Sequence, residues 1–233
     1  MHSNRYIFIY SAVMVVVVAI ALTIVAVQLK PLQDKNIRIE KMQNILASVN
    51  MVVTTQNAQE LYTKYVKETL VVNEKGEVKE GVDAFTIELA LELKKPAAER
   101  HLPIYIATLD NGEKAYIVPL RGKGLWGAIW GYISFKSDFN TVVGTMFDHK
   151  SETPGLGAEI NTREFQQHFE GKKIFDDKGV FTSIGVLKGG AKPDDIHGVD
   201  AISGGTITSK GVEKMIRDCL IGYENYFKNP KKL

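Results

Sequence analysis

The sequence contains a single cysteine, Cys219, among its 233 residues. One thiol cannot form an intrachain disulfide, and it excludes zinc and iron–sulfur sites that need several cysteine ligands. The charge is nearly balanced, with 29 Lys and Arg against 27 Asp and Glu and a formal net charge of +2. No block of basic residues stands out, which argues against a nucleic-acid surface. With 45% hydrophobic and 24% charged residues, the chain has the composition of a folded protein.

The chain also lacks the G-x-x-x-x-G-K-[ST] pattern of P-loop proteins. Its segment Gly122–Gly127 (GKGLWG) does match the G-x-G-x-x-G pattern of dinucleotide-binding folds, but that pattern holds a pyrophosphate only where a helix follows. The next residues, Ala128–Phe135, predict a strand, so the loop is interpreted as a tight turn or a ligand wall. His149 and Glu152 are spaced i, i+3, but no third ligand is evident and no metal site is expected.

The one long hydrophobic run is Tyr6–Leu29, which carries no charge. It exceeds the roughly 20 apolar residues that a membrane-spanning helix needs, and also the roughly 7–15 of a signal-peptide core. An uncleaved N-terminal anchor is therefore predicted. The alternatives are a buried core helix and a signal peptide, since Ala19-Ile20-Ala21 has the small residues of a cleavage site. Pro31 is predicted to end the helix because proline has no backbone donor.

The flanking charges leave the orientation of this anchor open. Only Arg5 and the amino terminus precede the run, whereas Lys30, Lys35, Arg38 and Lys41 follow it. Counted literally, the positive-inside rule keeps the C-terminal part in the cytoplasm. Because so few residues precede the run, the positive-inside rule has few Lys and Arg residues to compare on that side.

Beyond the anchor, the spacing of apolar residues predicts one α+β domain on a stalk. Residues 37–49 and Ala58–Glu68 have helical spacing and are interpreted as a stalk or cap. Further on, alternation predicts strands, with tight turns at Asn73–Gly76 and Asp110–Gly112. The predicted strands are Leu70–Val72 with Glu77–Val78, Phe85–Leu93, Ile104–Leu109, Ala115–Leu120, Ile129–Phe135, Thr141–Phe147 and Val180–Leu187.

Two loops of small residues precede predicted helices. Ser151–Gly157 (SETPGLG) comes before a short helix at Asn161–Phe169, and Asp200–Ser209 (DAISGGTITS) leads into the last helix, with Thr208 or Ser209 as its cap. Glycines let the backbone approach a ligand, and a helix N-terminus offers N–H groups to a phosphate, so a capped turn and an anion site are both open. The predicted apolar face of the last helix consists of Val212, Met215, Ile216, Cys219, Leu220, Tyr223 and Phe227.

The segment Asp200–Ser209 resembles the flavinylation signature of the FMN-binding domain family, D-x-x-[ST]-G-A-T-x-T-S. In that family a transferase takes FMN from FAD and esterifies its phosphate to the threonine of the S-G-A-T step, which is Thr206 here. Gly205 replaces the usual alanine; because only a methyl is lost, flavinylation is expected to survive with a looser turn. Further matching segments are Gly124–Gly127, Glu152–Gly157, and Lys188–Ala191 ahead of His197–Asp200.

Together with the single N-terminal span, these motifs resemble the C-subunit family of the Na⁺-translocating NADH:quinone oxidoreductases. The resemblance implies a redox subunit of a sodium-transporting enzyme, with a soluble mixed α/β domain that carries covalent FMN. This domain is implied to relay electrons, and the flavin supplies the redox chemistry. Lys188 is implied to place its charge near the flavin carbonyl edge and favour anionic reduced forms. The alternatives are a solvated lysine and, for Trp126, a core tryptophan. The residues implied to hold FMN are Thr206, Ser203, Gly204, Gly205, Lys188, Glu152, Thr153, Leu156 and Trp126.

The implied partners are the other subunits of the membrane complex, a flavin transferase for maturation and the lipid around the anchor. The implied location is the inner membrane, with the soluble domain in the periplasm. The predicted division of the chain is 1–29 for the anchor, 30–69 for the helical stalk or cap, and 70–233 for the FMN-binding domain. Two alternative functions are a subunit of the related ion-translocating ferredoxin:NAD oxidoreductase, and a membrane-tethered, non-enzymatic module that binds a phosphate ligand.

Overall fold

A computed structural model of the chain describes residues 3–230. The first two residues of the predicted anchor and the last three of the predicted FMN-binding domain lie outside the described residues. The chain forms two compact units, one up to Lys41 and the other from Met42 on.

Helix α1 (Asn4–Ala47) contains the long hydrophobic run. Among residues 3–230 it is the one helix that is long and apolar enough to cross a membrane. Pro31 lies inside this helix, so the prediction that it ends the helix was wrong. A proline removes a single backbone hydrogen bond, and the flanking residues, which have favourable helix propensities, continue the helix past it. Lys30 Nζ and Asp34 Oδ1 lie 3.3 Å apart, one turn from each other around the proline.

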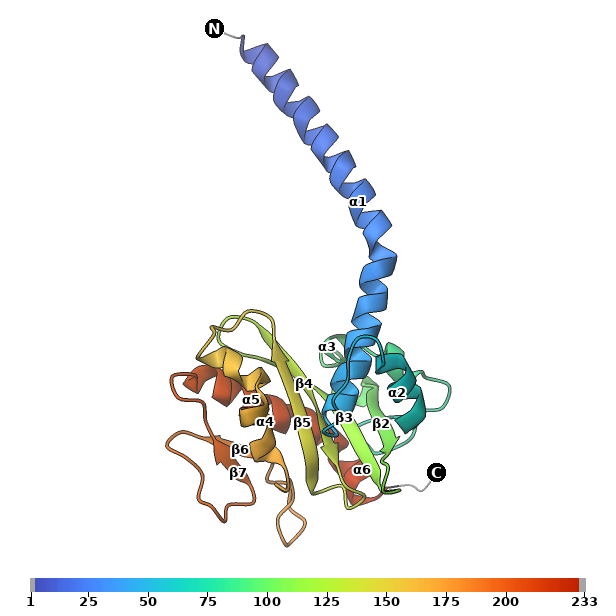
Figure 1. Cartoon of the computed structure of the whole chain (residues 1–233), viewed down its shortest axis with the longest axis vertical. Helices are drawn as coiled ribbons and strands as arrows, with labels where there is room; N and C mark the ends of the chain where they lie inside the picture. Colours follow the sequence, from blue (N-terminus) through green and yellow to red (C-terminus); the bar gives the residue numbers. More distant parts are fainter. Residues whose placement is uncertain (1–2, 231–233) are drawn as a thin grey trace. The chain divides into compact units, whose positions relative to one another are not determined.

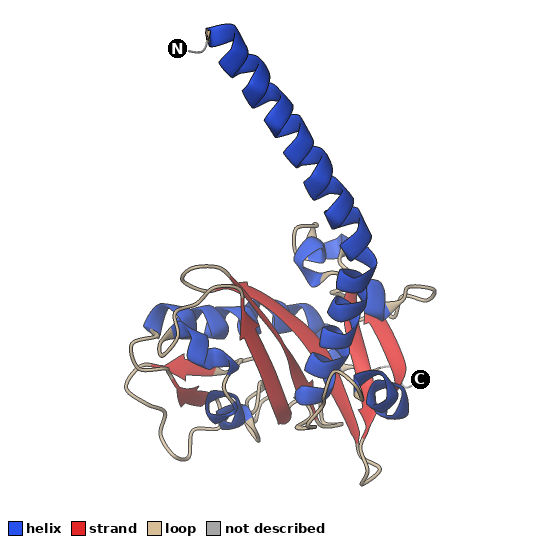
Figure 2. Ribbon diagram, turned by 45° about the horizontal axis from the view of Figure 1, so that its top comes forward, coloured by secondary structure: helices blue, strands red, loops and turns tan. Residues whose placement is uncertain are grey.

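The second unit is built on a five-stranded antiparallel sheet in which each strand pairs with its neighbours along the chain, in the order β1-β2-β3-β4-β5. A separate small parallel sheet is formed by β6 and β7, and Figure 2 shows both sheets in red. The predicted α+β class is thus confirmed. The strands are β1 (Val66–Val72), β2 (Leu102–Thr108), β3 (Lys114–Lys123), β4 (Ala128–Phe135), β5 (Val142–His149), β6 (Gly185–Leu187) and β7 (Gly198–Asp200).

Short helices connect these strands and cover the large sheet. Figure 1 shows α5 and α6 running along the sheet near the C-terminal end of the chain. The α-helices of this unit besides the end of α1 are α2 (Ala58–Tyr65), α3 (Leu89–Glu92), α4 (Arg163–Gln166), α5 (Thr206–Leu220) and α6 (Glu224–Lys228). The 3₁₀ helices are η1 (Ala84–Thr86), η2 (Ala97–Glu99), η3 (Gly157–Asn161), η4 (Gln167–Phe169) and η5 (Ile221–Tyr223).

Two apolar clusters form the core of this unit. The larger cluster joins the sheet to α5 and α6 and includes Phe135 and Ile216. The smaller one joins the sheet to the last turn of α1, where Ile45 and Leu46 are fully buried. All seven residues of the predicted apolar face are buried, as expected, but the prediction of one continuous last helix was wrong, because Tyr223 lies in η5 and Phe227 in α6. Because α5 is packed along its whole apolar face, its N-terminus is held at a fixed place beside the sheet.

Most of the predicted strands and turns are confirmed. The strands expected around residues 104–109, 115–120, 129–135 and 141–147 correspond to β2, β3, β4 and β5. The two predicted turns form as well, with Gly76 at a φ of +77° and Gly112 at +82°. Glycine is required there because other residues rarely adopt the left-handed region.

Several predicted elements differ from the structure. Phe85–Leu93 is not a strand but contributes to η1 and α3. The Asp83 side chain caps η1 by accepting a hydrogen bond from Phe85 N at 2.9 Å. The segment Leu-Ala-Leu-Glu of α3 consists of residues that favour helix. The strand expected at Val180–Leu187 is limited to β6, since Ser183 has a left-handed φ of +64°. Helix α2 ends at Tyr65 rather than at residue 68, where β1 already runs, and the helix expected at 161–169 is divided between α4 and 3₁₀ turns.

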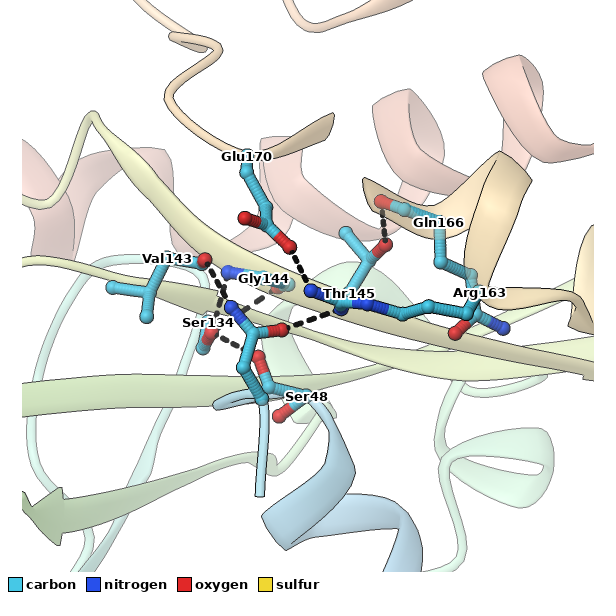
Figure 3. A network of polar contacts seen from close by, with 9 residues as sticks. Ser48, Ser134, Val143, Gly144, Thr145, Arg163, Gln166 and Glu170 are labelled. Carbon is cyan, nitrogen blue, oxygen red and sulfur yellow. Dashed lines mark hydrogen bonds and ion pairs between the residues drawn. The ribbon is translucent and has the colours of Figure 1, made fainter. Parts of the chain in front are cut away.

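A polar network fixes the chain that leaves α1 to strand β5 (Figure 3). Asn50, at a left-handed φ of +64°, donates from Nδ2 to the carbonyl of Val143 at 3.2 Å. Its Oδ1 accepts from Arg163 Nη1 at 2.7 Å, and Arg163 also pairs with Glu170. Val143 is the extra residue of a β-bulge, which turns its carbonyl out of the strand ladder.

The same network contains a fully buried hydroxyl, that of Ser134 on β4. Its Oγ donates to the carbonyl of Ser48 at 2.5 Å and accepts from Gly144 N at 3.1 Å. A Cβ at Gly144 would lie 2.7 Å from the Ser48 carbonyl oxygen, so glycine is needed for this close approach.

Candidate functional site

The signature segment ends in the first turn of α5. The helix begins at Thr206, with Gly205 at the N-cap position and no side-chain cap. The prediction that Thr208 or Ser209 caps the helix was wrong, because both residues lie inside it and are buried. Gly204, at a φ of +73°, makes the left-handed turn just before the helix. Backbone N–H groups of the first turn therefore have no capping side chain and are available to an anionic group.

The glycine that replaces the usual alanine lies in a tight environment. Gly205 is buried, and its N–H donates to the Ile202 carbonyl at 3.0 Å. A Cβ at this position would lie 2.9 Å from Ile202 Cγ2 and 3.2 Å from the Leu156 carbonyl oxygen. The Ile202 side chain thus occupies the space beside Gly205. The looser turn expected from the missing methyl stays a prediction.

The four hydroxyls of the signature have different surroundings. Thr208 Oγ1 donates to Glu152 Oε2 at 2.5 Å. Ser209 Oγ accepts at 3.1 Å from a backbone N–H of the turn before the helix. Ser203 is exposed. The Thr206 side chain is half-buried, and no residue in the described range 3–230 forms a hydrogen bond with its hydroxyl. Thr206 therefore has a half-buried hydroxyl without a hydrogen bond in the described part of the chain.

A cavity of about 230 Å³ opens at the start of α5. The predicted site residues that line it are Glu152, Thr153, Leu156, Gly204, Gly205 and Thr206. Four further wall residues were not predicted to hold FMN, namely Leu125, Gly157, Ile207 and Thr208, although Thr208 was expected as a helix cap. All four belong to the motif segments themselves, so the motifs could have pointed to them. The structure thus brings together three segments that are far apart in the sequence.

Three predicted site residues are not among the wall residues of this cavity. Ser203 lies just before them, and the Trp126 side chain is 66% exposed, which excludes the core-tryptophan alternative. Lys188 is exposed in the turn after β6, and this turn is held by Asp200, whose Oδ1 accepts from Ala191 N at 2.7 Å. The influence of Lys188 on a flavin stays a prediction.

Glu152 is the most highly coordinated side chain of the site. Its Oε1 accepts from the backbone N–H groups of Trp126 at 2.9 Å and Gly127 at 3.3 Å. Its Oε2 accepts from Leu125 N at 3.3 Å and from the Thr208 hydroxyl. Burial alone would raise the pKa of this carboxyl, but the hydrogen bond from Thr208 and those from the three backbone N–H groups lower it below its usual value. Glu152 is therefore a buried carboxylate whose negative charge is balanced by four donors.

Two motif glycines make room for this carboxylate. A Cβ at Gly124 would lie 2.6 Å from Oε1, and a Cβ at Gly157 would lie 2.7 Å from Oε2. The Glu152 N–H donates to His149 Nδ1 at 3.2 Å, so the i, i+3 pair is a hydrogen-bonded turn. Within residues 3–230 no group of three His, Cys, Asp or Glu side chains could hold a metal ion.

Apolar side chains remain exposed around the mouth of the cavity. Leu125, Trp126, Leu156 and Ile207 are each exposed by between 41% and 66%, and three of them line the cavity. Exposed apolar side chains that gather at one opening indicate a surface that is covered by a ligand or a partner.

Comparisons with known proteins agree with this geometry. The model of the FMN-binding domain family matches residues 124–221, a range that includes all three wall segments. The C subunit of the Na⁺-translocating NADH-quinone reductase of Haemophilus ducreyi is 34% identical over 82% of this chain and 80% of the relative. Its counterpart from Neisseria meningitidis is 32% identical over 88% of this chain and 87% of the relative.

Solved structures of two such proteins have the same fold. The crystal structure from Parabacteroides distasonis has a TM-score of 0.80 and 43% identity, and the match covers 87% of this chain and 98% of that one. The structure from Shewanella oneidensis has a TM-score of 0.70 and 28% identity, over 82% and 96% of the two chains. This chain therefore belongs to the C-subunit family of the Na⁺-translocating NADH-quinone reductase, and its C-terminal part is an FMN-binding domain.

Proposed function

We propose that this chain is the electron-carrying flavoprotein subunit of a Na⁺-pumping NADH:quinone oxidoreductase and that it holds FMN through a phosphoester to Thr206. The observation that carries the proposal is the state of the signature hydroxyls. Only Thr206 and Thr208 line the cavity, and the Thr208 hydroxyl donates to Glu152. Of the two signature hydroxyls at the cavity, the one on Thr206 is thus the one that forms no hydrogen bond within the described residues and is free to form an ester.

The start of α5 fits a phosphate in this place. Thr206 is the first residue of a 15-residue helix without a side-chain cap, so backbone N–H groups and the positive end of the helix dipole face an anion bound there. The apolar side chains at the cavity mouth fit a planar ring system. The residues present therefore suit FMN, which when bound supplies the capacity to accept and release electrons.

Attachment needs FAD and a flavin transferase, because the bond between the two phosphates of FAD provides the leaving group. The Thr206 oxygen attacks the phosphorus of the FMN half, and the bond from this phosphorus to the AMP half breaks. AMP leaves, and the hydroxyl proton passes to a base of the transferase. No electrons change hands in this step. The chain contributes the hydroxyl and the N–H groups that receive the phosphate.

The attachment site is tested by Thr206→Ala, expressed with a flavin transferase and analysed on a denaturing gel. Flavin fluorescence is expected to disappear from the band while the amount of folded protein stays the same. Ser203→Ala is the matched control, because it removes an exposed hydroxyl of the same segment, and it should keep the fluorescence. Fluorescence that persists in Thr206→Ala would move the ester elsewhere, and its absence in the wild type would favour a non-covalent phosphate-binding module.

We also propose that α1 anchors the chain in the inner membrane, with the soluble domain on the periplasmic side. The length and apolar character of the helix support the anchor, and family membership supports electron transfer to other subunits of the complex. Protease added to intact spheroplasts should digest the domain. If the domain is protected until the membrane is broken, the orientation given by the positive-inside count is correct and the proposed one is wrong.

A further inference from the structure

We propose that Glu152 is a positioning residue for the attachment of FMN, because its carboxylate joins the Gly124–Gly127 loop to the first turn of α5 and thereby places the Thr206 hydroxyl. The inference rests on the proposed function. It gives Glu152 a role distinct from contact with the flavin.

The carboxylate links three segments that are far apart in the sequence. Glu152 belongs to the ETPGLG loop, its oxygens accept three backbone N–H groups of the GLWG loop, and Oε2 also accepts from Thr208 of the signature. The glycines at positions 124 and 157 provide the space for its two oxygens. One buried side chain thus accounts for one glycine in each of two motifs, Gly124 and Gly157, and for the second threonine of the third, Thr208.

The contact with Glu152 adds to the packing of α5 on the sheet in fixing the position of its first turn. Gly205, at the N-cap, has no side chain that could fix the turn. The turn is held instead by two hydroxyls that follow Thr206. Thr208 is bonded to Glu152, and Ser209 is bonded to the Ile202 N–H on the other side of the helix start. Thr206 lies in the same turn, two residues before Thr208, so a shift of either anchor moves its hydroxyl.

The negative charge of Glu152, and not only its shape, is required. Each carboxylate oxygen accepts two hydrogen bonds. A glutamine keeps one oxygen, but its NH₂ group is a donor and would face the donating N–H of Leu125. Because Glu152 is only 5% exposed, water cannot replace the lost acceptor easily.

The same geometry argues against direct binding of the flavin by Glu152. Its lone pairs are already occupied by donors of the protein, and an ionised carboxylate would repel a phosphate unless its charge were balanced. The four donors provide this balance. The Thr208 hydroxyl also donates its hydrogen bond to Glu152, which leaves Thr206 as the reactive hydroxyl of the first turn.

The test measures the rate of covalent flavin incorporation into the full chain, purified in detergent and incubated with a purified flavin transferase and FAD. The variants are Glu152→Gln, Thr208→Val, which removes the hydroxyl at nearly constant volume, and Thr208→Ser, which restores it. Glu159→Gln is the matched control, because Glu159 lies in η3, directly after the loop of Glu152, and its carboxylate accepts from Gly155 N and not from α5. Rates are taken from intact mass and in-gel fluorescence, well below each variant's melting temperature.

Glu152→Gln and Thr208→Val are each expected to lower the turnover constant about tenfold or more, with an unchanged KM for FAD, since a misplaced nucleophile loses rate rather than affinity. Thr208→Ser should recover most of the wild-type rate, and Glu159→Gln should leave it unchanged. If Glu152→Gln does not fold, the Thr208 pair decides, because Thr208→Val deletes only one of the four hydrogen bonds.

Wild-type rates in both folded Glu152→Gln and Thr208→Val would overturn the positioning role. So would a loss in Thr208→Val that Thr208→Ser does not recover. Neither result contradicts the proposed function, which fails if Thr206→Ala still accepts flavin or if the wild-type chain accepts none. The two ideas therefore fail in separate experiments.

Discussion

Two buried serines of the domain are expected to respond in opposite ways to the loss of their hydroxyl. Ser183 is 2% exposed, lies at a left-handed φ of +64°, and its Oγ has no hydrogen-bond partner among the described residues. Ser134 is fully buried, and its Oγ donates to the Ser48 carbonyl and accepts from Gly144 N. The two residues thus offer the same chemical change in a partnered and an unpartnered setting.

The expected magnitudes follow from these surroundings. A buried hydroxyl without a partner costs about 1–3 kcal/mol, so Ser183→Ala should stabilise the domain by about 1 kcal/mol or more. Ser183→Gly removes the hydroxyl and also the left-handed strain, which is worth about 1 kcal/mol. Against this, the greater freedom of glycine in the unfolded chain lowers the free energy of unfolding by about 0.5–1 kcal/mol. Ser134→Ala leaves two buried backbone groups unpaired and should destabilise by about 2 kcal/mol.

The assay is thermal unfolding of the full chain in mild detergent, followed by tryptophan fluorescence, since both tryptophans, Trp126 and Trp130, belong to the domain. For a domain of this size, 1 kcal/mol corresponds to a shift in melting temperature of about 2–4 °C. Ser183→Ala and Ser183→Gly should melt higher than the wild type and Ser134→Ala lower. Equal destabilisation by Ser183→Ala and Ser134→Ala would show that the Ser183 hydroxyl is bonded, and would refute the reasoning.

Three further outcomes are expected. Burial alone would raise the pKa of Glu152 and Asp138, but their hydrogen bonds lower the pKa of each carboxyl in the folded state. The two carboxylates therefore stabilise the fold above the ordinary carboxyl pKa of about 4. This stabilisation is lost as the pH falls through the lower folded-state pKa. Melting temperatures measured from pH 7 to pH 3 should fall at the acid end, and less steeply in Glu152→Gln; identical curves would contradict this. Gly205→Ala should keep flavinylation on the denaturing gel but lower the melting temperature, because overpacking against Ile202 costs about 1 kcal/mol or more; a higher melting temperature would show that Ile202 repacks freely. Asn50→Ala should destabilise more than Asn50→Gly, since alanine keeps the left-handed strain of about 1 kcal/mol, and equal melting temperatures would count against that strain.

Family membership and the α+β class could be read from local patterns in the sequence. A membrane-spanning helix is indicated by a long uncharged run, hairpins by glycine-containing turns between alternating residues, and the last helix by its apolar spacing. The signature around Thr206 is likewise a contiguous segment. Each of these signals lies within one stretch of chain, so no tertiary contact is needed to recognise it.

Local patterns failed where neighbouring segments decide the backbone. The alternation in Phe85–Leu93 suggested a strand, but the Asp83 cap and strong helix formers produced two short helices. Pro31 looked like the end of a helix that continues to Ala47. The strand expected from Val180 is interrupted at Ser183, where buried backbone takes a left-handed conformation that serine rarely adopts.

The residues that carry the flavin signature can be identified from the order of amino acids alone, because they are contiguous and chemically distinctive. How these residues are used depends on the packing of the folded chain. Glu152 and Thr208 are 56 positions apart, and their hydrogen bond follows from the packing of α5 on the sheet. That packing buries the Glu152 carboxylate among four donors, commits the Thr208 hydroxyl and leaves the Thr206 hydroxyl free at the cavity. Which hydroxyl is available is therefore set by long-range contacts, about which the local pattern carries no information.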